Sequence, residues 1–346
     1  MKDPMIFVPS ECVAYLKKNI EQEIGINLFY WLGKIQGWMG TKLLTKKYGF
    51  QAKDFEKLLD GASLDGWGKP ILNSELDLKN LNARMEVTIK NPTIALANQG
   101  NDEHQDNFCE DYVTGELAGG GEVLFNKNIT GTEIRCIAKG DDKCLLKFWP
   151  VEKEEFPLED FDLQKYLSTI ELLMFNRNYP FKWISKREIE YSEGQFKFKG
   201  IQGVLILSYI YVLMDYIMYT KKSEFYKELQ KDNARQHLEK VKKNLKKGVQ
   251  TTSKLEENLS HIEIFGFGKY EIKHVLKSGL YIIENKNNPY TDDFIKIFGT
   301  QNFGHYFIQF LLEEFFSYII DKRVEVSEKE CKLTGGKSCI FHVKTR

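Results

Sequence analysis

One short segment occurs twice in this chain and constrains its fold more than any other feature. Both copies read E-x2-C-x7-C, with a glycine four residues after the first cysteine. The motif residues are Glu133, Cys136 and Cys144 in Gly131 to Trp149, and Glu328, Cys331 and Cys339 in Val326 to Val343. Four of the chain's six cysteines lie in these copies. The pattern therefore predicts a duplicated local structure that brings two thiols together.

Each copy is typical of a β-hairpin. A β-prone run leads into a turn, at 139–142 in the first copy and 334–337 in the second, and a second β-prone run follows. Turns centred there place Cys136 opposite Cys144 and Cys331 opposite Cys339, at the roughly 4.5 to 5.5 Å spacing of a cross-strand pair. Thiols this close form a disulfide or share a metal.

The N-terminal residues favour the metal. Met1 to Phe7 contains no apolar run of the length of a signal peptide, so we expect a cytoplasmic protein, in which cysteines more often serve metal or chemistry than disulfides. Carboxylate is an accepted zinc ligand, so Glu133 and Glu328 are candidates. Residues three apart on a regular strand point to opposite faces, however. The glutamates can join the cysteines only where the strand bends or bulges.

A fourth ligand is available upstream of each copy. Cys109 lies 27 residues before Cys136, and His305 lies 26 residues before Cys331, each shortly after an Asn-Phe pair. Taken alone, His305 is better explained as a polar helix residue near a core, but its repeated position makes it an equally good candidate ligand. The two predicted centres are Cys109, Glu133, Cys136, Cys144 and His305, Glu328, Cys331, Cys339.

The repeated hairpin resembles the C-terminal signature E-x2-C-x3-G-x3-C-x-F of the 4-vinyl reductase domain family. The matching residues are Glu133, Cys136, Gly140 and Cys144, with Leu146 in place of the aromatic, and Glu328, Cys331, Gly335, Cys339 and Phe341. Family members bind small molecules and include hydrocarbon-binding proteins and the sensor halves of phenol- and xylene-responsive activators. A zinc site of the phenol-sensor type maps onto Cys109, Glu133, Cys136 and Cys144, whereas the second copy has His305 where a cysteine is expected.

The resemblance implies a mixed α/β fold similar to the small TRAPP-complex tethering subunits. We expect two tandem domains, 1–150 and 151–346, each with a helical layer on a small antiparallel sheet that ends in the cysteine-bearing hairpin. Pro150 and the acidic run that follows it mark the boundary. Lys plus Arg equals Asp plus Glu, at 49 each, so no global basic surface for nucleic acid is expected.

Two apolar segments are candidates for the interior. Ile26 to Met39 is rich in aromatic residues and glycines, which indicates a central helix that another element approaches closely. Val204 to Met214 is too short to span a membrane, which needs about 20 residues, and is expected to be the equivalent core helix. Core packing explains both segments; the more specific hypothesis is that they line an apolar pocket. Its candidate residues are Phe29, Trp31, Trp38, Tyr209 and Tyr211.

Other patterns complete the expected architecture. Gly66 to Lys69 and Gly266 to Lys269 predict tight turns before paired strands. Helices are expected at about 106–126 and 160–176, a hairpin at 187–200, and a long charged helical segment at about 219–260 without a counterpart in the first half. That segment carries a lysine cluster, for which a solvated helix face is the default and an acidic partner or membrane surface the alternative.

Three functions remain open. The first is a zinc-stabilised sensor or carrier for a small apolar molecule, with its output through a partner protein. The second is a scaffold or tethering protein, in which a protein partner or a homodimer is expected. The third is an enzyme acting on a tetrapyrrole-like hydrophobe, which the chain supports least because it contains no G-x-S-x-G, H-E-x-x-H or dinucleotide fingerprint. Four protein ligands would make each zinc structural.

Overall fold

The computed structural model describes residues 5–73, 85–99, 109–158, 161–176, 189–248, 251–276 and 279–346. The fold is mixed, with α-helices and antiparallel sheets, as predicted. The described residues divide into two compact units, unit 1 with Pro9–Ile206, and unit 2 with residues 5–8 and Leu207–Arg346. This division concerns compactness rather than the extent of the sequence repeat, so domains at 1–150 and 151–346 stay a prediction.

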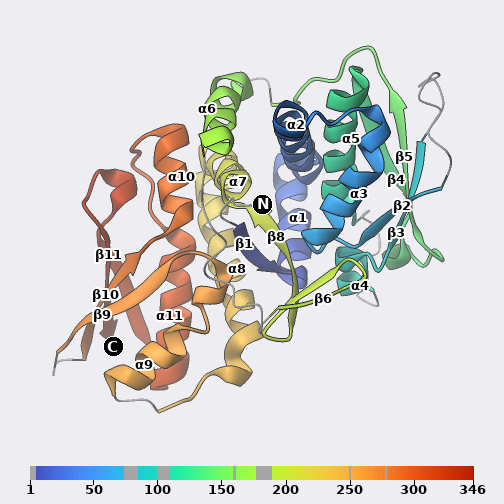
Figure 1. Ribbon diagram of the computed structural model, residues 1–346. Helices are drawn as coiled ribbons and strands as arrows, with labels where there is room; N and C mark the ends of the chain where they lie inside the picture. Colours follow the sequence, from blue (N-terminus) through green and yellow to red (C-terminus); the bar gives the residue numbers. More distant parts are fainter. Residues whose placement is uncertain are drawn as a thin grey trace. The chain divides into compact units, whose positions relative to one another are not determined.

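The element order occurs twice along the chain (Figure 1). The first series is β1 (Met5–Pro9), α1 (Ser10–Ile24), α2 (Leu28–Tyr48), α3 (Phe55–Leu64), β2 (Lys69–Leu72), β3 (Met85–Lys90), α4 (Thr93–Asn98), α5 (Asp111–Phe125), β4 (Ile129–Arg135) and β5 (Cys144–Pro150). The second is β8 (Ile201–Leu207), α7 (Ser208–Lys221), α8 (Ser223–Val241), α9 (Thr252–Leu259), β9 (Lys269–Leu276), β10 (Leu280–Lys286), α10 (Pro289–Phe298), α11 (Tyr306–Ile320), β11 (Val324–Glu330) and β12 (Cys339–Thr345).

Three elements lie between the two series: α6 (Leu163–Asn176), β6 (Ile189–Ser192) and β7 (Gln195–Phe198). β6 and β7 form the predicted hairpin, and β7 continues antiparallel to β8. The predicted helix at 160–176 is α6. The first residues of the predicted helix at 106–126 lie outside the described residues, and the described part is α5.

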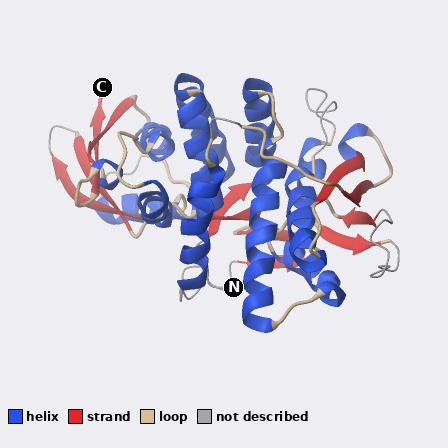
Figure 2. Ribbon diagram, turned by 90° about the horizontal axis from the view of Figure 1, so that it is seen from above, coloured by secondary structure: helices blue, strands red, loops and turns tan. Residues whose placement is uncertain are grey.

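The sheets repeat as the helices do. Unit 1 contains the order β2-β3-β5-β4 and unit 2 the corresponding order β9-β10-β12-β11, with antiparallel neighbours. In each unit this four-stranded sheet packs against helices (Figure 2), with α5 against β4 and α11 against β11. The tandem arrangement of a helical layer on a small antiparallel sheet is therefore confirmed.

Two expectations about the second half were wrong. Val204 to Leu207 is strand, and only the residues after it are helical, so α7 corresponds in order to α1, and α8 is the counterpart of α2. The error arose because a continuous apolar run fits a buried strand and a buried helix equally well. The charged segment at 219–260 is helical as expected and contains the end of α7, then α8 and α9, but the first half does contain comparable helices, α2 and α3.

Among the residues that the structure describes, no helix combines the length and the apolarity needed to cross a bilayer.

Glycines allow α2 and α5 to pack with their backbones in contact. A methyl group on Gly37 would lie 1.9 Å from the carbonyl oxygen of Glu116, and one on Gly115 would lie 1.8 Å from that of Tyr30. A methyl group on Gly33 or Gly119 would also lie 2.0 Å from the nearest carbonyl oxygen. These four glycines form two small-residue pairs, each spaced by four residues. The close approach predicted from the glycines of 26–39 is present, and α5 is the approaching element.

Replacing Gly37 with alanine should therefore destabilise unit 1, because the new methyl group overlaps a backbone atom that cannot rotate away. We expect the free energy of unfolding to fall by about 1–3 kcal/mol. Gly40→Ala is the control, since its methyl group meets nothing within 4 Å; alanine there should stabilise the helix by about 0.5–1 kcal/mol. Urea denaturation followed by circular dichroism measures both. Equal effects of the two substitutions would contradict this packing.

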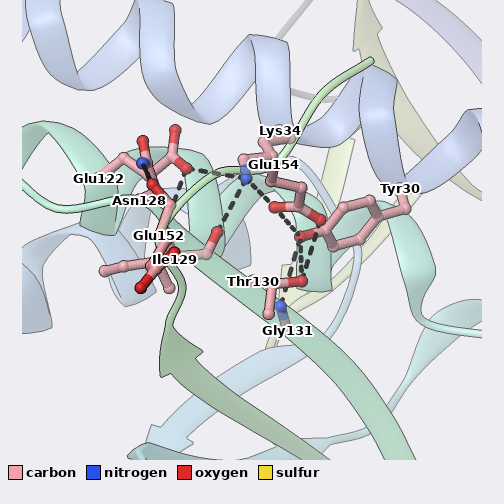
Figure 3. A network of polar contacts seen from close by, with 9 residues as sticks. All are labelled: Tyr30, Lys34, Glu122, Asn128, Ile129, Thr130, Gly131, Glu152 and Glu154. Atoms are coloured by element: carbon pink, nitrogen blue, oxygen red, sulfur yellow. Dashed lines mark hydrogen bonds and ion pairs between the residues drawn. The ribbon is translucent and has the colours of Figure 1, made fainter. Parts of the chain in front are cut away.

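A buried lysine holds the segment that follows β5 against α2 and β4 (Figure 3). The Lys34 side chain is 8% exposed; its Nζ pairs with Glu122 at 2.8 Å and with Glu154, and donates to the carbonyl oxygen of Ile129 at 2.8 Å. The Glu154 carboxylate also accepts from the hydroxyl of Thr130 at 3.0 Å.

Other residues of this segment make further contacts. Asn128 donates to the carbonyl oxygen of Glu152 at 2.6 Å, and the Trp31 ring lies 5.6 Å from the Phe156 ring. The acidic run predicted as a boundary is thus packed on unit 1.

Lys34→Met should cost unit 1 about 3–5 kcal/mol, since it leaves two half-buried carboxylates without their cation. The control is Lys147→Met, because the pair between Lys147 and Glu86 is partly exposed on both sides and contributes only about 0–1 kcal/mol. Thermal and urea unfolding of the two variants give the comparison. If Lys34→Met were no worse than Lys147→Met, the network would contribute nothing to stability.

Candidate metal centres

Each repeated hairpin ends in the same tight turn. β4 stops at Arg135, and Cys136 precedes a 3-10 turn (Ile137–Lys139) that Gly140 ends with a φ of 92°. In the second copy Cys331 precedes Lys332–Thr334, and Gly335 has a φ of 93°. Glycine suits both positions because other residues rarely adopt a positive φ. The predicted turns are confirmed in place, but Cys136 and Cys331 lie in the turn and not in the strand as a cross-strand pair requires.

The turn nevertheless brings the two thiols of each copy together. The sulfurs of Cys136 and Cys144 are 3.9 Å apart, which is far longer than the roughly 2.05 Å of a disulfide. The backbone N–H of Ile137 donates to the Cys144 sulfur at 3.4 Å, and that of Lys332 donates to the Cys339 sulfur at 3.5 Å. Hydrogen bonds from Cys331, His305 and the backbone N–H of Lys332 lower the pKa of Cys339 to about 5, which favours the thiolate, the form of cysteine that binds metals.

A strand irregularity directs the glutamate of each motif toward the cysteines. The pairing of β4 with β5 changes register between Glu133 and Arg135, and that of β11 with β12 changes register between Glu328 and Glu330. This is the bulge that the three-residue spacing between glutamate and cysteine required.

Both glutamates also accept hydrogen bonds from the start of a helix. Glu133 Oε2 accepts from the backbone N–H groups of Cys109 at 2.8 Å and Glu110 at 3.0 Å, directly before α5. Glu328 Oε2 accepts from the N–H of His305 at 3.2 Å, directly before α11. The first N–H groups of a helix have no partner within the helix and attract negative charge. Each glutamate thus connects the hairpin to the helix that carries the upstream candidate ligand.

The first centre brings together Glu133, Cys136 and Cys144, whose donor atoms lie within 4.8 Å of one another and are buried. Cys109 lies beside this group, with its thiol hydrogen-bonded to Cys136 and accepting from Asn98 Nδ2 at 3.4 Å. Beside these thiols, the buried carboxylate oxygens Glu133 Oε1 and Glu110 Oε2 have no hydrogen-bond partner. Such unpaired acceptors next to thiols fit a site for a cation.

The second centre brings together all four predicted residues, His305, Glu328, Cys331 and Cys339, within 4.8 Å. His305 Nδ1 lies 2.7 Å from Glu328 Oε1 and 3.3 Å from the Cys331 sulfur. The other ring nitrogen, Nε2, lies 2.7 Å from the hydroxyl of Thr291. His305 therefore belongs to the group of candidate ligands, and its role as a metal ligand stays a prediction.

The pKa shifts reflect how closely acidic groups are buried together in the first centre. Burial, and then the neighbouring Cys136, raises the pKa of Glu133 to about 8. Burial and then Glu133 raise the pKa of Glu110 well above its ordinary value. Hydrogen bonds from the Cys109 and Cys144 thiols lower the pKa of Cys136. A bound cation would supply the positive charge that keeps these carboxylates and thiolates ionised together, so the residues present fit a metal.

A water-sized cavity lies next to the second centre in unit 2. Its volume is about 10 Å3, which is room for roughly one water molecule. The lining residues are Asp215, Tyr226, Phe267, Tyr290, Gly304, His305, Tyr306, Phe307 and Ile308. His305 thus belongs to both the metal group and the cavity wall.

The five residues predicted to line a ligand pocket are not among those that line this cavity. Phe29, Tyr209 and Tyr211 are buried, and the Tyr211 ring lies 5.5 Å from that of Phe267, which does line it. Trp31 contacts Phe156, and Trp38 lies beneath Lys42. Their role in ligand binding stays a prediction.

Sequence reasoning missed Glu110, Asn98 and Thr291. The position of Glu110 directly after Cys109 was the only signal in the sequence. Asn98 and Thr291 lie on α4 and α10, whose positions beside the centres follow from the tertiary fold and from no spacing in the sequence.

The substitution Glu133→Gln separates two roles of the glutamate. Glutamine keeps an oxygen that can accept the helix N–H groups but removes the negative charge, so we expect the zinc affinity of the first centre to fall about tenfold or more. Competition with a chromogenic chelator measures this. Glu86→Gln on β3 of the same sheet is the control and should leave zinc affinity unchanged. Unchanged affinity in Glu133→Gln would mean that the glutamate only caps the helix.

Comparisons with known proteins leave the family open. No family model matches the chain, and no curated protein matches it. Among solved structures, the phenol-responsive sensory domain of the transcription activator PoxR with phenol is similar at 13% identity and a TM-score of 0.38, covering 46% of this chain and 85% of that one. A trafficking protein particle complex subunit 3 from Naegleria fowleri covalently bound to palmitic acid is similar at 11% identity and a TM-score of 0.30, covering 42% and 98%. Both TM-scores are below 0.5, so membership of the 4-vinyl reductase domain family remains a prediction.

Proposed function

We propose that this chain is a zinc-stabilised binding module for a small apolar or aromatic molecule, acting as a sensor or carrier. The observation that carries the proposal is that His305 belongs to the second metal group and also lines the adjacent cavity. Binding in the cavity and metal in the centre would therefore share one side chain.

Zinc is the metal that the two donor sets favour. Thiolate, imidazole and carboxylate are all common zinc ligands, and four such donors complete a tetrahedral site. A centre with four protein ligands has no position for water or substrate, so its role is structural. The metal would fix the hairpin to the start of α5 or α11, and in unit 2 it would hold one wall of the cavity.

The cavity places the carboxylate of Asp215 among aromatic rings, with His305 and tyrosine side chains beside it. The buried carboxylate of Asp215 accepts hydrogen bonds from Tyr290, Tyr226 and Gln230, and burial raises its pKa to about 7. Phe267, Phe307 and Ile308 supply apolar wall. A ligand with a mainly apolar body and one polar end would suit these surroundings. Because the cavity has room for about one water, a larger ligand must displace side chains when it enters.

The proposal is tested on protein purified from its own host. Native mass spectrometry should detect a bound small molecule, and Ile308→Phe, which fills the cavity while keeping it apolar, should remove it. Leu172→Phe, at a position 61% exposed in unit 1, is the control and should retain it. Exhaustive chelation should release the molecule and lower the melting temperature, because His305 loses the metal that holds it. A chain that is always empty, or whose melting is unchanged after the metal is removed, would contradict the proposal.

A further inference from the structure

The side chain of Thr291 contacts the second centre without belonging to the metal group. Its hydroxyl lies 2.7 Å from His305 Nε2, and the Thr291 residue is 1% exposed. Thr291 is itself held in place, because its backbone N–H donates to Asn288 Oδ1, the cap at the start of α10. The hydroxyl is therefore presented to the imidazole by a fixed helix start.

The two nitrogens of His305 face different surroundings. Nδ1 faces the donor group, at 2.7 Å from Glu328 Oε1 and 3.3 Å from the Cys331 sulfur. Nε2 faces Thr291. A histidine binds a metal through a nitrogen lone pair, and the hydrogen bond made by the other nitrogen determines which one is available.

We propose that Thr291 is the positioning residue of the second centre: its hydroxyl accepts the Nε2–H of His305 and thereby commits Nδ1 to the metal. This inference rests on the proposed metal centre. It assigns to α10 a role in selecting both the tautomer and the orientation of a ligand that lies on a different element, at the start of α11.

Unit 1 has a related arrangement on the corresponding helix. Asn98, at the end of α4, donates through Nδ2 to the sulfur of Cys109, the upstream candidate ligand of the first centre. In each unit, therefore, the helix after the second sheet strand supplies a side chain that orients the upstream ligand. The orienting side chain matches the candidate ligand in each unit. In unit 1 the amide of Asn98 donates to the sulfur of Cys109, and in unit 2 the hydroxyl of Thr291 can accept from an imidazole N–H of His305.

The first test uses the unmodified chain loaded with cadmium-113 and labelled with 15N-histidine. Only six histidines contribute signals. We expect one histidine to show coupling to cadmium through Nδ1, with Nε2 protonated, and His305→Gln to remove that signal. Coupling through Nε2 would overturn the proposal. A chain with cadmium bound at neither centre would overturn the proposed metal centres together with it, whereas cadmium at both centres with Nε2 coupling would overturn this inference alone.

The second test compares two substitutions of similar size. Thr291→Val removes the hydroxyl and should lower the zinc affinity of the second centre about 10- to 100-fold, while the first centre in the same chain keeps its affinity. Thr291→Ser retains the hydroxyl and should restore affinity to near that of the unmodified chain. Thr220→Val, at an exposed position of α7, is the control for loss of a threonine hydroxyl. Equal affinity in Thr291→Val and Thr291→Ser, both folded by circular dichroism, would contradict the role.

Discussion

The hydrogen bonds between one carboxylate and the start of a helix determine the geometry of both centres. The N–H groups before α5 and α11 converge on Glu133 Oε2 and Glu328 Oε2, respectively. Each glutamate lies at a strand bulge, three residues before a cysteine. The interaction therefore fixes the position of the upstream ligand relative to the two thiols. It acts together with the packing of α5 on β4 and of α11 on β11, which brings each helix start to its hairpin.

The two units use this common arrangement around different interiors. In unit 1, glycines bring the backbones of α2 and α5 into contact. In unit 2 the corresponding helices are α8 and α11, which contain no glycine and pack through large side chains such as Phe307. Aromatic side chains of this size cannot pack as closely as glycines, and the water-sized cavity lies among them beside His305. We therefore expect ligand binding in unit 2 rather than between α2 and α5.

The glycine before each sheet shows that the repeats are related beyond the hairpins. A methyl group on Gly66 would lie 2.9 Å from the carbonyl oxygen of Gly203 on β8, and one on Gly266 would lie 2.8 Å from that of Met5 on β1. Both glycines have a positive φ, 90° and 86°. The same motif thus makes the same close contact with the opening strand of a repeat in each unit.

Much of the candidate site could be predicted from the sequence because its information is local. The spacing of Glu133 and Cys136 required a bulge, and the bulge is present; the glycine after each cysteine marked the turn. The upstream positions of Cys109 and His305 followed from comparison of the two copies. What failed depended on tertiary context: the apolar run at 204–214 did not reveal where strand gives way to helix, and nothing local indicated that Thr291 faces His305.

The proposed structural role of both centres requires a bound cation in each. Elemental analysis of the purified chain measures the number of zinc ions, and zinc K-edge X-ray absorption measures their distances to the ligands. The account predicts two zinc ions per chain with zinc–sulfur distances of about 2.3 Å and shorter zinc–nitrogen or zinc–oxygen distances of about 2.0–2.2 Å. A metal-free chain that is fully folded, or one whose hairpin cysteines are joined as disulfides, would contradict it.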